Sequence, residues 1–349
     1  MKVLGISCGR RMSNTEIMVK EALMGAEEAG AEVEFIRLHD LYIKPCTGCN
    51  SCVIDLMERS GGGKCSLKGD DFPFIDDKIM ECDGLILGSP IYEKSPTGQL
   101  KSLEDRMGPS HDQGFRMIAK KIREEKGITA GAGPDERAFK PRAASLIAVG
   151  GSEWDTLALP IMSMFTLTMQ IEVVDRILVN WIGLPRVIAL RDDLLGRARR
   201  SGRHVAETLK KPLEEAEYIG EPGLCPLCHS KLIEVRHDGD AYPCICGICG
   251  VRGAVRVLDG KVRFDVSDED RPRSHLLLSG KFEHLQELAD VSLKPPVNME
   301  ELPAKVAKYK DYLTPLRPDR EVAGVGAATL RGATRPSAST PSDDEPMDD

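Results

Sequence analysis

Residues 2–38 read KVLGISCGRRMSNTEIMVKEALMGAEEAGAEVEFIRL, and this opening stretch decides the fold. Residues 2–6 form a short apolar run that predicts a strand, and residues 13–30 have the apolar spacing of a helix. Residues 31–38 alternate polar with apolar side chains, as a second strand does. A strand, a helix and a strand in this order predict a βαβ unit with parallel strands.

The same alternation continues to about residue 190. Apolar runs at 84–87, 144–149 and 172–180 bring the number of expected strands to five. We therefore expect an α/β fold, a parallel sheet of order 2-1-3-4-5 with helices on both faces. A charged helical stretch at 192–217 closes this first domain, which we place at 1–217.

Composition and charge narrow the class of protein. The 349 residues carry a net charge of −8, with five carboxylates in the last seven residues, so a nucleic-acid partner is not expected. Gly9, Arg10 and Arg11 follow MKVLGIS at once, and this apolar run is too short for a signal peptide. The longest uncharged stretch, 156–171, is shorter than the roughly 20 residues that span a bilayer and predicts a buried helix. We expect a cytoplasmic protein without a membrane segment.

The loop at 44–66 carries four cysteines, Cys46, Cys49, Cys52 and Cys65. The first three lie at intervals too short for all of them to form unstrained disulfides, but a backbone can wrap them around a compact iron-sulfur cluster. Cys65 follows Gly61, Gly62 and Gly63, a span able to fold back as the fourth ligand. We favour a 4Fe-4S cluster; a zinc site and a redox-active thiol group without metal remain alternatives.

A second cysteine module lies at 221–265. Cys225, Cys228, Cys246 and Cys249 form two CxxC knuckles, the spacing of a zinc ribbon with four thiolates around one Zn²⁺ ion. Rubredoxin-type iron is the alternative, and Cys244 is expected to be a spectator. The module holds six Lys and Arg against six Asp and Glu, which favours a structural or protein-contact role over nucleic-acid binding.

The remaining segments carry less information. The charged stretch at 108–140 predicts an insertion, either a lid or oligomer contact or a solvated surface excursion. Residues 266–314 have helical composition, and the acidic tail at 321–349 is rich in Ala, Gly, Ser, Thr and Pro and is expected to be disordered.

Two loops at the carboxyl ends of predicted strands carry polar side chains. After the first strand come Ser7, Gly9, Arg10, Ser13, Asn14 and Thr15, which lead into a helix N-terminus suited to a phosphate. The alternative is that Ser13 and Glu16 form a capping box that only starts the helix. After the third strand come Ser89, Pro90, Ile91 and Tyr92, and Gly98 opens the next helix. In a 2-1-3-4-5 sheet these loops meet at the switch point, where such folds bind FMN.

These loops and the cysteine spacing resemble the flavodoxin-like NAD(P)H-dependent FMN reductases, and within them the iron-sulfur flavoproteins. The resemblance implies that the stretch 9–15 holds the FMN phosphate and that 89–92 lies along the isoalloxazine ring. It also implies that Gly150, Gly151 and Ser152 close over the ring, with Trp154 either stacked near the flavin or in the core.

The resemblance implies a flavin-centred oxidoreductase that passes electrons between NAD(P)H or ferredoxin and an acceptor, through FMN and the cluster. It also implies a homo-oligomer, because a neighbouring subunit often completes the flavin site of such proteins. One alternative is an FMN or quinone reductase without a cluster. Another is a flavin-bearing redox sensor or adaptor that is not an enzyme.

Overall fold

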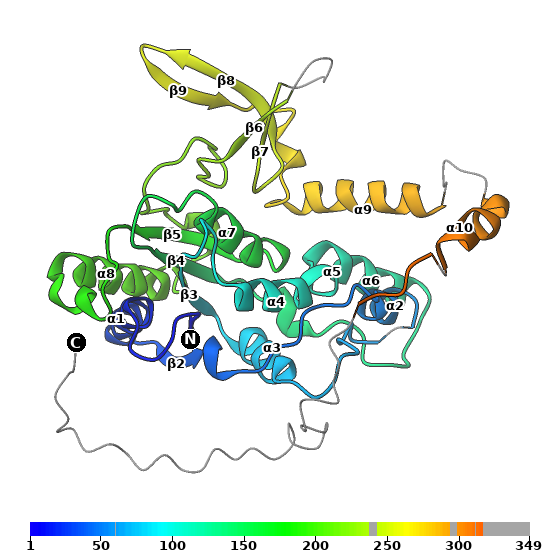
Figure 1. The fold of residues 1–349 in the computed structure, drawn as a ribbon, viewed down its shortest axis with the longest axis horizontal. Helices are drawn as coiled ribbons and strands as arrows, with labels where there is room; N and C mark the ends of the chain where they lie inside the picture. Colours follow the sequence, from blue (N-terminus) through cyan, green and yellow to red (C-terminus); the bar gives the residue numbers. More distant parts are fainter. Residues whose placement is uncertain (60, 237–242, 294–298, 311, 317–349) are drawn as a thin grey trace. The chain divides into compact units, whose positions relative to one another are not determined.

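The computed structural model describes residues 1–59, 61–236, 243–293, 299–310 and 312–316. Five parallel strands form a sheet of order β2-β1-β3-β4-β5, which confirms the predicted fold (Figure 1). The strands are β1 (Lys2–Ser7), β2 (Glu32–Arg37), β3 (Gly84–Pro90), β4 (Ala143–Val149) and β5 (Glu172–Val179). The inner strands β1, β3 and β4 are almost wholly buried because helices cover both faces.

Two apolar cores lie on the two faces of this sheet. The helices of one face are α1 (Asn14–Glu28) and α8 (Asp192–Thr208), and those of the other are α3 (Phe72–Glu81), α4 (Gly98–Arg106) and α7 (Ala158–Thr168). Leu4 and Ile6 of β1 point to the second core, whereas Val3 points to the first, as the period-two alternation of a strand requires. Phe165 of α7 is buried, so the uncharged stretch at 156–171 is a core helix, as predicted.

Helices α1 and α8 pack unusually closely, and two glycines make this possible. A Cβ atom on Gly202 would lie 1.7 Å from the carbonyl oxygen of Ala22, and one on Gly25 would lie 1.9 Å from that of Arg199. Each glycine therefore lets the backbone of one helix touch the backbone of the other. The buried hydroxyls of Ser145 on β4 and Ser201 on α8 lie 2.6 Å apart and link the helix to the sheet below it.

A second sheet follows in the chain. It is antiparallel, of order β6-β7-β8-β9, and has a small core of its own around the second cysteine module. Its strands are β6 (Ile233–Val235), β7 (Cys244–Cys246), β8 (Arg252–Leu258) and β9 (Lys261–Asp265). Residues 1–290 form one compact unit that contains both sheets, and the described residues after 290 belong to a second unit. The domain boundaries at 217 and 265 stay predictions.

The segment at 108–140 folds into α5 (Gly108–His111), α6 (Gln113–Glu125) and a 3-10 turn at Glu136–Phe139. Asp112 caps α6, and Lys281 of α9 (Leu278–Leu293) forms an ion pair with the same carboxylate at 2.5 Å. This contact ties the insertion to the chain beyond the ribbon. The region 266–314 also contains α10 (Leu302–Lys310), whereas the predicted disordered tail lies outside the described residues.

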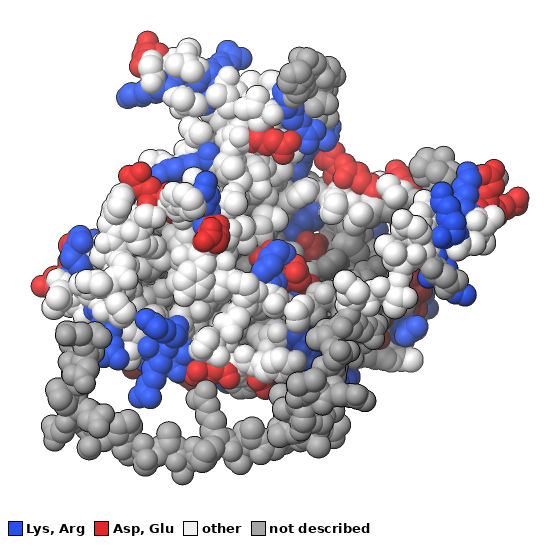
Figure 2. Space-filling model, in the orientation of Figure 1, with Lys and Arg blue, Asp and Glu red and all other residues white. Residues whose placement is uncertain are grey.

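The distribution of surface charge and the length of the helices are relevant to two possible partners, nucleic acid and membrane. Figure 2 shows basic and acidic side chains interspersed on the face drawn, with no single basic stripe. Among the described helices, none has the length and apolar character needed to cross a membrane. The absence of a nucleic-acid partner remains a prediction.

The remaining short elements connect these layers. They are α2 (Ser51–Met57) in the cysteine loop and the 3-10 turns at Leu38–Asp40, Val187–Leu190, Leu213–Glu215, Arg271–Arg273 and Met299–Glu301.

Candidate functional site

The first loop of the candidate flavin site follows β1. Ser7 is fully buried, and its Oγ accepts from the backbone N–H of Gly9 at 3.3 Å. A Cβ on Gly9 would lie 2.2 Å from the Oγ of Ser13, so the loop closes tightly only around a glycine. The result is a tight loop at the N-terminus of α1, a position that suits a phosphate.

Ser13 is the N-cap of α1, as the capping alternative proposed, but the Glu16 carboxylate accepts from Met12 and not from the Ser13 N–H of a true capping box. The Ser13 Oγ accepts from the Glu16 N–H at 3.2 Å, and the Glu16 carboxylate accepts from the Met12 N–H at 3.3 Å. The hydroxyl proton of Ser13 is still available to a ligand, so capping and phosphate binding are compatible. Burial would raise the pKa of Glu16, but hydrogen bonds from Arg37 and Lys20 outweigh it and lower the pKa to about 2.

The other predicted phosphate residues divide into two groups. Arg10 is exposed and available, whereas Thr15 is buried against β3. Asn14 is engaged within the chain, because its Nδ2 donates to the Leu184 carbonyl at 2.8 Å and its Oδ1 accepts from the Ile188 N–H at 3.2 Å. Asn14 therefore anchors the segment after β5, a role that its position beside Ser13 did not indicate.

The second loop lies beside the first, because β1 and β3 are neighbours in the sheet. The Cys8 N–H donates to the Gly88 carbonyl at 2.8 Å, and the buried Ser89 Oγ accepts from the Thr97 N–H at 3.1 Å. Thr97 in turn caps α4, which begins at Gly98. Burial raises the pKa of the Cys8 thiol to about 12, so this thiol stays neutral between the two loops.

The third loop completes the crevice. Ile91 donates its N–H to the Val149 carbonyl at 2.9 Å, and its side chain packs on Gly150, where a Cβ would lie 3.0 Å from Ile91 Cδ1. Trp154 is 63% exposed and lies under Lys94, whose Nζ is 5.3 Å from the ring centroid, so Trp154 is not a core residue. Tyr92 is equally exposed at the turn after β3.

The structure thus brings together the predicted loops that begin at Ser7, Ser89 and Gly150, with Pro90, Gly151 and Ser152 in their backbone. A tight glycine loop at a helix N-terminus and exposed aromatic rings in the neighbouring loops fit a phosphate-bearing flat ligand such as FMN.

The four cysteines of the 44–66 loop line one small cavity. Gly48 and Asn50 take left-handed backbone conformations that turn the chain between Cys46 and Cys52. The glycine span folds back over α2, because the Gly63 N–H donates to the Asp55 carboxylate at 3.0 Å. Cys65 therefore reaches the same cavity as the other three, as predicted from the glycines.

The spacing of these sulfurs differs from that of a single-ion site. Among the described residues, the four ribbon cysteines are the group whose ligand atoms all lie within 4.8 Å of one another, and the loop cysteines do not form such a group. The sulfur ligands of a single Zn²⁺ ion lie within such a distance of one another, whereas the thiolate sulfurs around a cluster of several irons lie farther apart. Hydrogen bonds from Ser51 and Ser66 lower the pKa of the exposed Cys49 thiol to about 6, which favours the ligating thiolate.

Arg106 supplies the sharpest sign of an absent group at this cavity. Its side chain is fully buried, lines the cavity with the four thiols and stacks on Phe72 with the guanidinium 4.1 Å from the ring centroid. Nη1 pairs with Asp70 and donates to the Lys44 carbonyl, but Nε and Nη2 have no partner among the described residues. Oδ1 of the paired Asp70 is likewise buried without a partner among the described residues. Buried donors rarely stay unpaired, and the two nitrogens of Arg106 would suit an anionic acceptor such as a thiolate-bound cluster.

The ribbon cysteines form a closed tetrahedral set. Cys225 and Cys249 have their sulfurs 3.7 Å apart, and Cys228 and Cys246 have theirs 3.4 Å apart. Zinc–sulfur bonds of about 2.3 Å at tetrahedral angles predict roughly 3.8 Å between sulfurs, so the quartet fits one such ion. Rubredoxin-type iron fits the same shell. Cys244 is buried outside the quartet, as a spectator should be.

Comparisons with known proteins agree with this geometry. The profile of the family described as NADPH-dependent FMN reductase matches residues 1–176. A flavone synthase of Aspergillus candidus is 33% identical over 297 residues, which are 82% of this chain and 88% of that protein. An iron-sulfur flavoprotein of Methanocaldococcus jannaschii is 46% identical over 110 residues, 31% of this chain and 53% of that protein.

A solved structure also matches most of this chain in three dimensions. A flavone reductase superposes with a TM-score of 0.78 at 36% identity, covering 91% of this chain and 100% of that chain. Its coverage extends well beyond the first sheet. The chain therefore belongs to the NADPH-dependent FMN reductase family and is a flavin oxidoreductase.

Proposed function

We propose that the chain passes electrons between NAD(P)H or ferredoxin and an acceptor through FMN and a 4Fe-4S cluster in the 44–66 loop. The observation that carries the cluster is the cavity shared by four cysteines and by Arg106, two of whose three guanidinium nitrogens are unpaired among the described residues. When bound, FMN supplies hydride acceptance and one-electron transfer.

The residues proposed to hold FMN have separate tasks. Ser7, Gly9 and Ser13 form the phosphate loop, with Arg10 as an added cation. The residues proposed to position the ring are Ser89, Pro90, Ile91, Tyr92, Gly98, Gly150, Gly151, Ser152 and Trp154. Asn14 and Thr15 support the loop from behind, because their side chains are engaged with the segment after β5 and with β3.

Anaerobic purification tests the cluster. We expect about four irons and about four acid-labile sulfides per chain, with a visible absorption beyond that of the flavin. Cys65→Ser should lower both counts, whereas the control Cys82→Ser, which changes a buried thiol at the end of α3 that does not line the cysteine cavity, should leave them unchanged. Flavin bands without iron would instead favour the FMN or quinone reductase alternative.

The electron donor is tested separately. NADH, NADPH and reduced ferredoxin are each mixed anaerobically with the protein, and at least one should bleach the flavin rapidly. Failure of all three would show that none of them is the electron donor. A homo-oligomer and a cytoplasmic location remain part of the proposal, and sedimentation velocity tests the first.

A second candidate concerns the organic acceptor. The flavone synthase and the flavone reductase resemble this chain over 82% and 91% of its length, so the likeness includes the part beyond residue 176. The exposed rings of Tyr92 and Trp154 offer flat apolar surfaces at the crevice. We propose that this enzyme reduces, or in reverse oxidises, the C2–C3 bond of a flavone-type enone.

The balanced reaction sets the test. A flavone, NADPH and a proton give a flavanone and NADP⁺, so the product gains two hydrogens. Mass spectrometry of anaerobic incubations should show this gain with a flavone and none with a flavan, which lacks the enone. Absence of any product in either direction, with a flavin that NADPH reduces, would reject this substrate class alone.

A further inference from the structure

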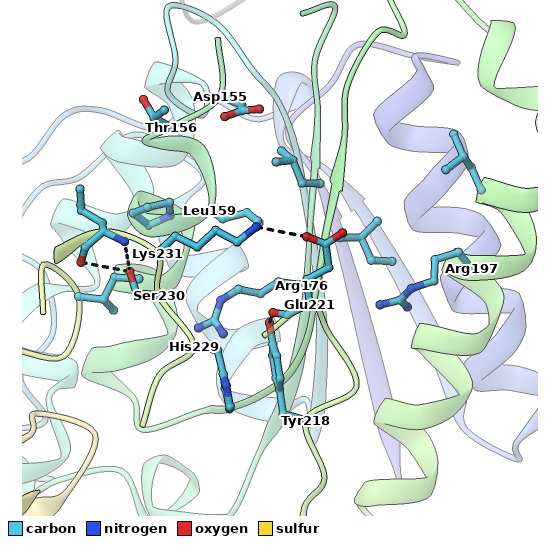
Figure 3. A pocket seen from close by; sticks show the side chains of 16 residues that line it. Asp155, Thr156, Leu159, Arg176, Arg197, Tyr218, Glu221, His229, Ser230 and Lys231 are labelled. Atoms are coloured by element: carbon cyan, nitrogen blue, oxygen red, sulfur yellow. Dashed lines mark hydrogen bonds and ion pairs between the residues drawn. The ribbon is translucent and has the colours of Figure 1, made fainter. Parts of the chain in front are cut away.

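A cavity of about 460 Å³ lies between the edge strand β5 and the ribbon, and its lining includes none of the residues proposed to hold FMN or the cluster (Figure 3). Its size is that of a small-molecule site. Most of its lining is apolar, with Leu159 and Pro160 from α7, Leu178 from β5 and Ile248 from the ribbon. Binding a ligand with a flat apolar body would be favourable here, because it removes the apolar surfaces of ligand and cavity from water.

The charges around this cavity leave one cation incompletely satisfied. Arg197 is paired with Asp175 at 2.5 Å, and Lys231 is paired with Glu221 at 3.2 Å. Arg176 donates from Nε to the Ser163 Oγ at 3.2 Å, but its buried Nη1 has no partner among the described residues. No described carboxylate forms an ion pair with Arg176, and Glu172 on the same strand acts on it only through a longer-range charge interaction. The cavity is therefore lined by one guanidinium that lacks a paired anion.

An aromatic platform adjoins that guanidinium. The rings of Tyr218 and His229 are stacked, with centroids 3.8 Å apart and planes 4° apart. The Arg176 guanidinium lies 5.6 Å from the Tyr218 centroid, and Figure 3 shows it extending from the sheet toward His229. The backbone N–H of His229 donates to the Cys225 carbonyl at 3.0 Å, so a knuckle of the ribbon holds the backbone that carries the His229 ring.

We propose that this cavity binds a flat aromatic anion. A carboxylate or phenolate oxygen accepts from the Arg176 guanidinium, and the ring lies among the Tyr218–His229 pair and the apolar walls. The ribbon completes the site by supplying Ile248 and His229. The proposal depends on neither the cluster nor the flavone acceptor.

Isothermal titration of the full-length, flavin-loaded protein with 2-naphthoate tests the site. The neutral isostere 2-naphthamide should bind at least about tenfold more weakly, because it cannot form the charged hydrogen bond. Arg176→Gln should weaken naphthoate at least about tenfold and the amide by less than about twofold. The matched control Lys231→Gln removes a charge from the same cavity and should change neither affinity by more than about twofold.

Equal affinity of the wild type for the two probes, no binding of either, or unchanged naphthoate affinity in Arg176→Gln would overturn the proposal. Flavin content and circular dichroism show whether that variant folds. Leu178→Trp gives an independent test, because the larger ring fills the cavity and leaves every buried donor in place. It should abolish naphthoate binding, and unchanged binding would place the ligand elsewhere.

Discussion

Arg106 shows how a single residue can report a missing partner. Its ion pair with Asp70 and its stacking on Phe72 hold the guanidinium in place, yet two of its nitrogens meet no acceptor among the described residues. A buried charge with unsatisfied donors is costly unless an anion completes its shell. The thiols of the 44–66 loop border the same cavity, so a thiolate-bound cluster would supply that anion.

Replacing Arg106 should therefore affect the cluster before the flavin. Arg106→Gln should weaken cluster retention about tenfold and lower its reduction potential, because an outer hydrogen-bond donor and a positive charge are lost. Arg106→Lys should be milder. Iron and sulfide counts and an electron-paramagnetic-resonance titration measure both effects.

Lys101→Gln, on the exposed side of the same helix, is the control and should change neither quantity. Arg106→Gln also breaks the buried pair with Asp70, which costs about 3–5 kcal/mol, so urea unfolding of each variant is measured in parallel. Full cluster content in a folded Arg106→Gln protein would contradict the assignment.

Glu16 makes stability depend on acid pH. Its folded pKa of about 2 lies below the usual value, so the carboxylate contributes stability above about pH 4.5 and loses it as pH falls toward 2. Glu16→Gln should cost on the order of 2 kcal/mol at pH 7 and much less near pH 2. Denaturant unfolding at the two pH values measures this. A cost that is equal at both would show that the charge is not responsible.

At the level of elements, the close approach of α1 and α8 depends on glycine. Gly202→Ala should destabilise the protein by about 1–3 kcal/mol, because the added methyl overlaps the Ala22 carbonyl. Gly196→Ala is the matched control on the same helix, where the nearest neighbour of a new Cβ is the movable Arg200 side chain at 3.6 Å. It should be neutral or stabilising by up to about 1 kcal/mol. Thermal or urea unfolding of the two variants measures their free energies of unfolding. Equal values would exclude a clash of the new methyl group with the Ala22 carbonyl as the cause.

The strands and helices themselves were predictable from local pattern. Buried strands such as β3 read as continuous apolar runs, and α1 shows its start in Ser13, which caps it. The contact of Asn14 with Leu184 had no such signal, because it joins residues that are 170 positions apart. A polar side chain next to a predicted phosphate loop looks the same in sequence whether it binds a ligand or anchors the chain.

At the level of the whole molecule, the ribbon contributes both to a proposed metal site and to the proposed ligand cavity. Cys246→Ser should remove about one bound metal ion per chain, because it breaks a closed four-thiolate shell. Cys244→Ser, two positions away and outside the quartet, is the control and should retain the ion. Elemental analysis counts the ion and identifies it as zinc or iron. Equal metal content in the two variants would contradict the quartet.

Loss of this ion should also abolish the binding of 2-naphthoate, since the Cys225 knuckle holds His229. Flavin content should stay unchanged, because the proposed FMN loops lie at the ends of β1, β3 and β4 and use no ribbon residue.

The order of strands, the two cysteine modules and the three loops at the sheet edge followed from the chain alone, because period, spacing and turn chemistry are local properties. Trp154 could not be assigned in this way, since an aromatic side chain suits a core and a binding surface equally. Tertiary structure placed it on the surface and left two guanidinium nitrogens of Arg106 unpaired among the described residues, beside the four thiols. It also built the Arg176 cavity from residues of β5, α7 and the ribbon. These features depend on which distant side chains share a volume, and only the folded chain decides that.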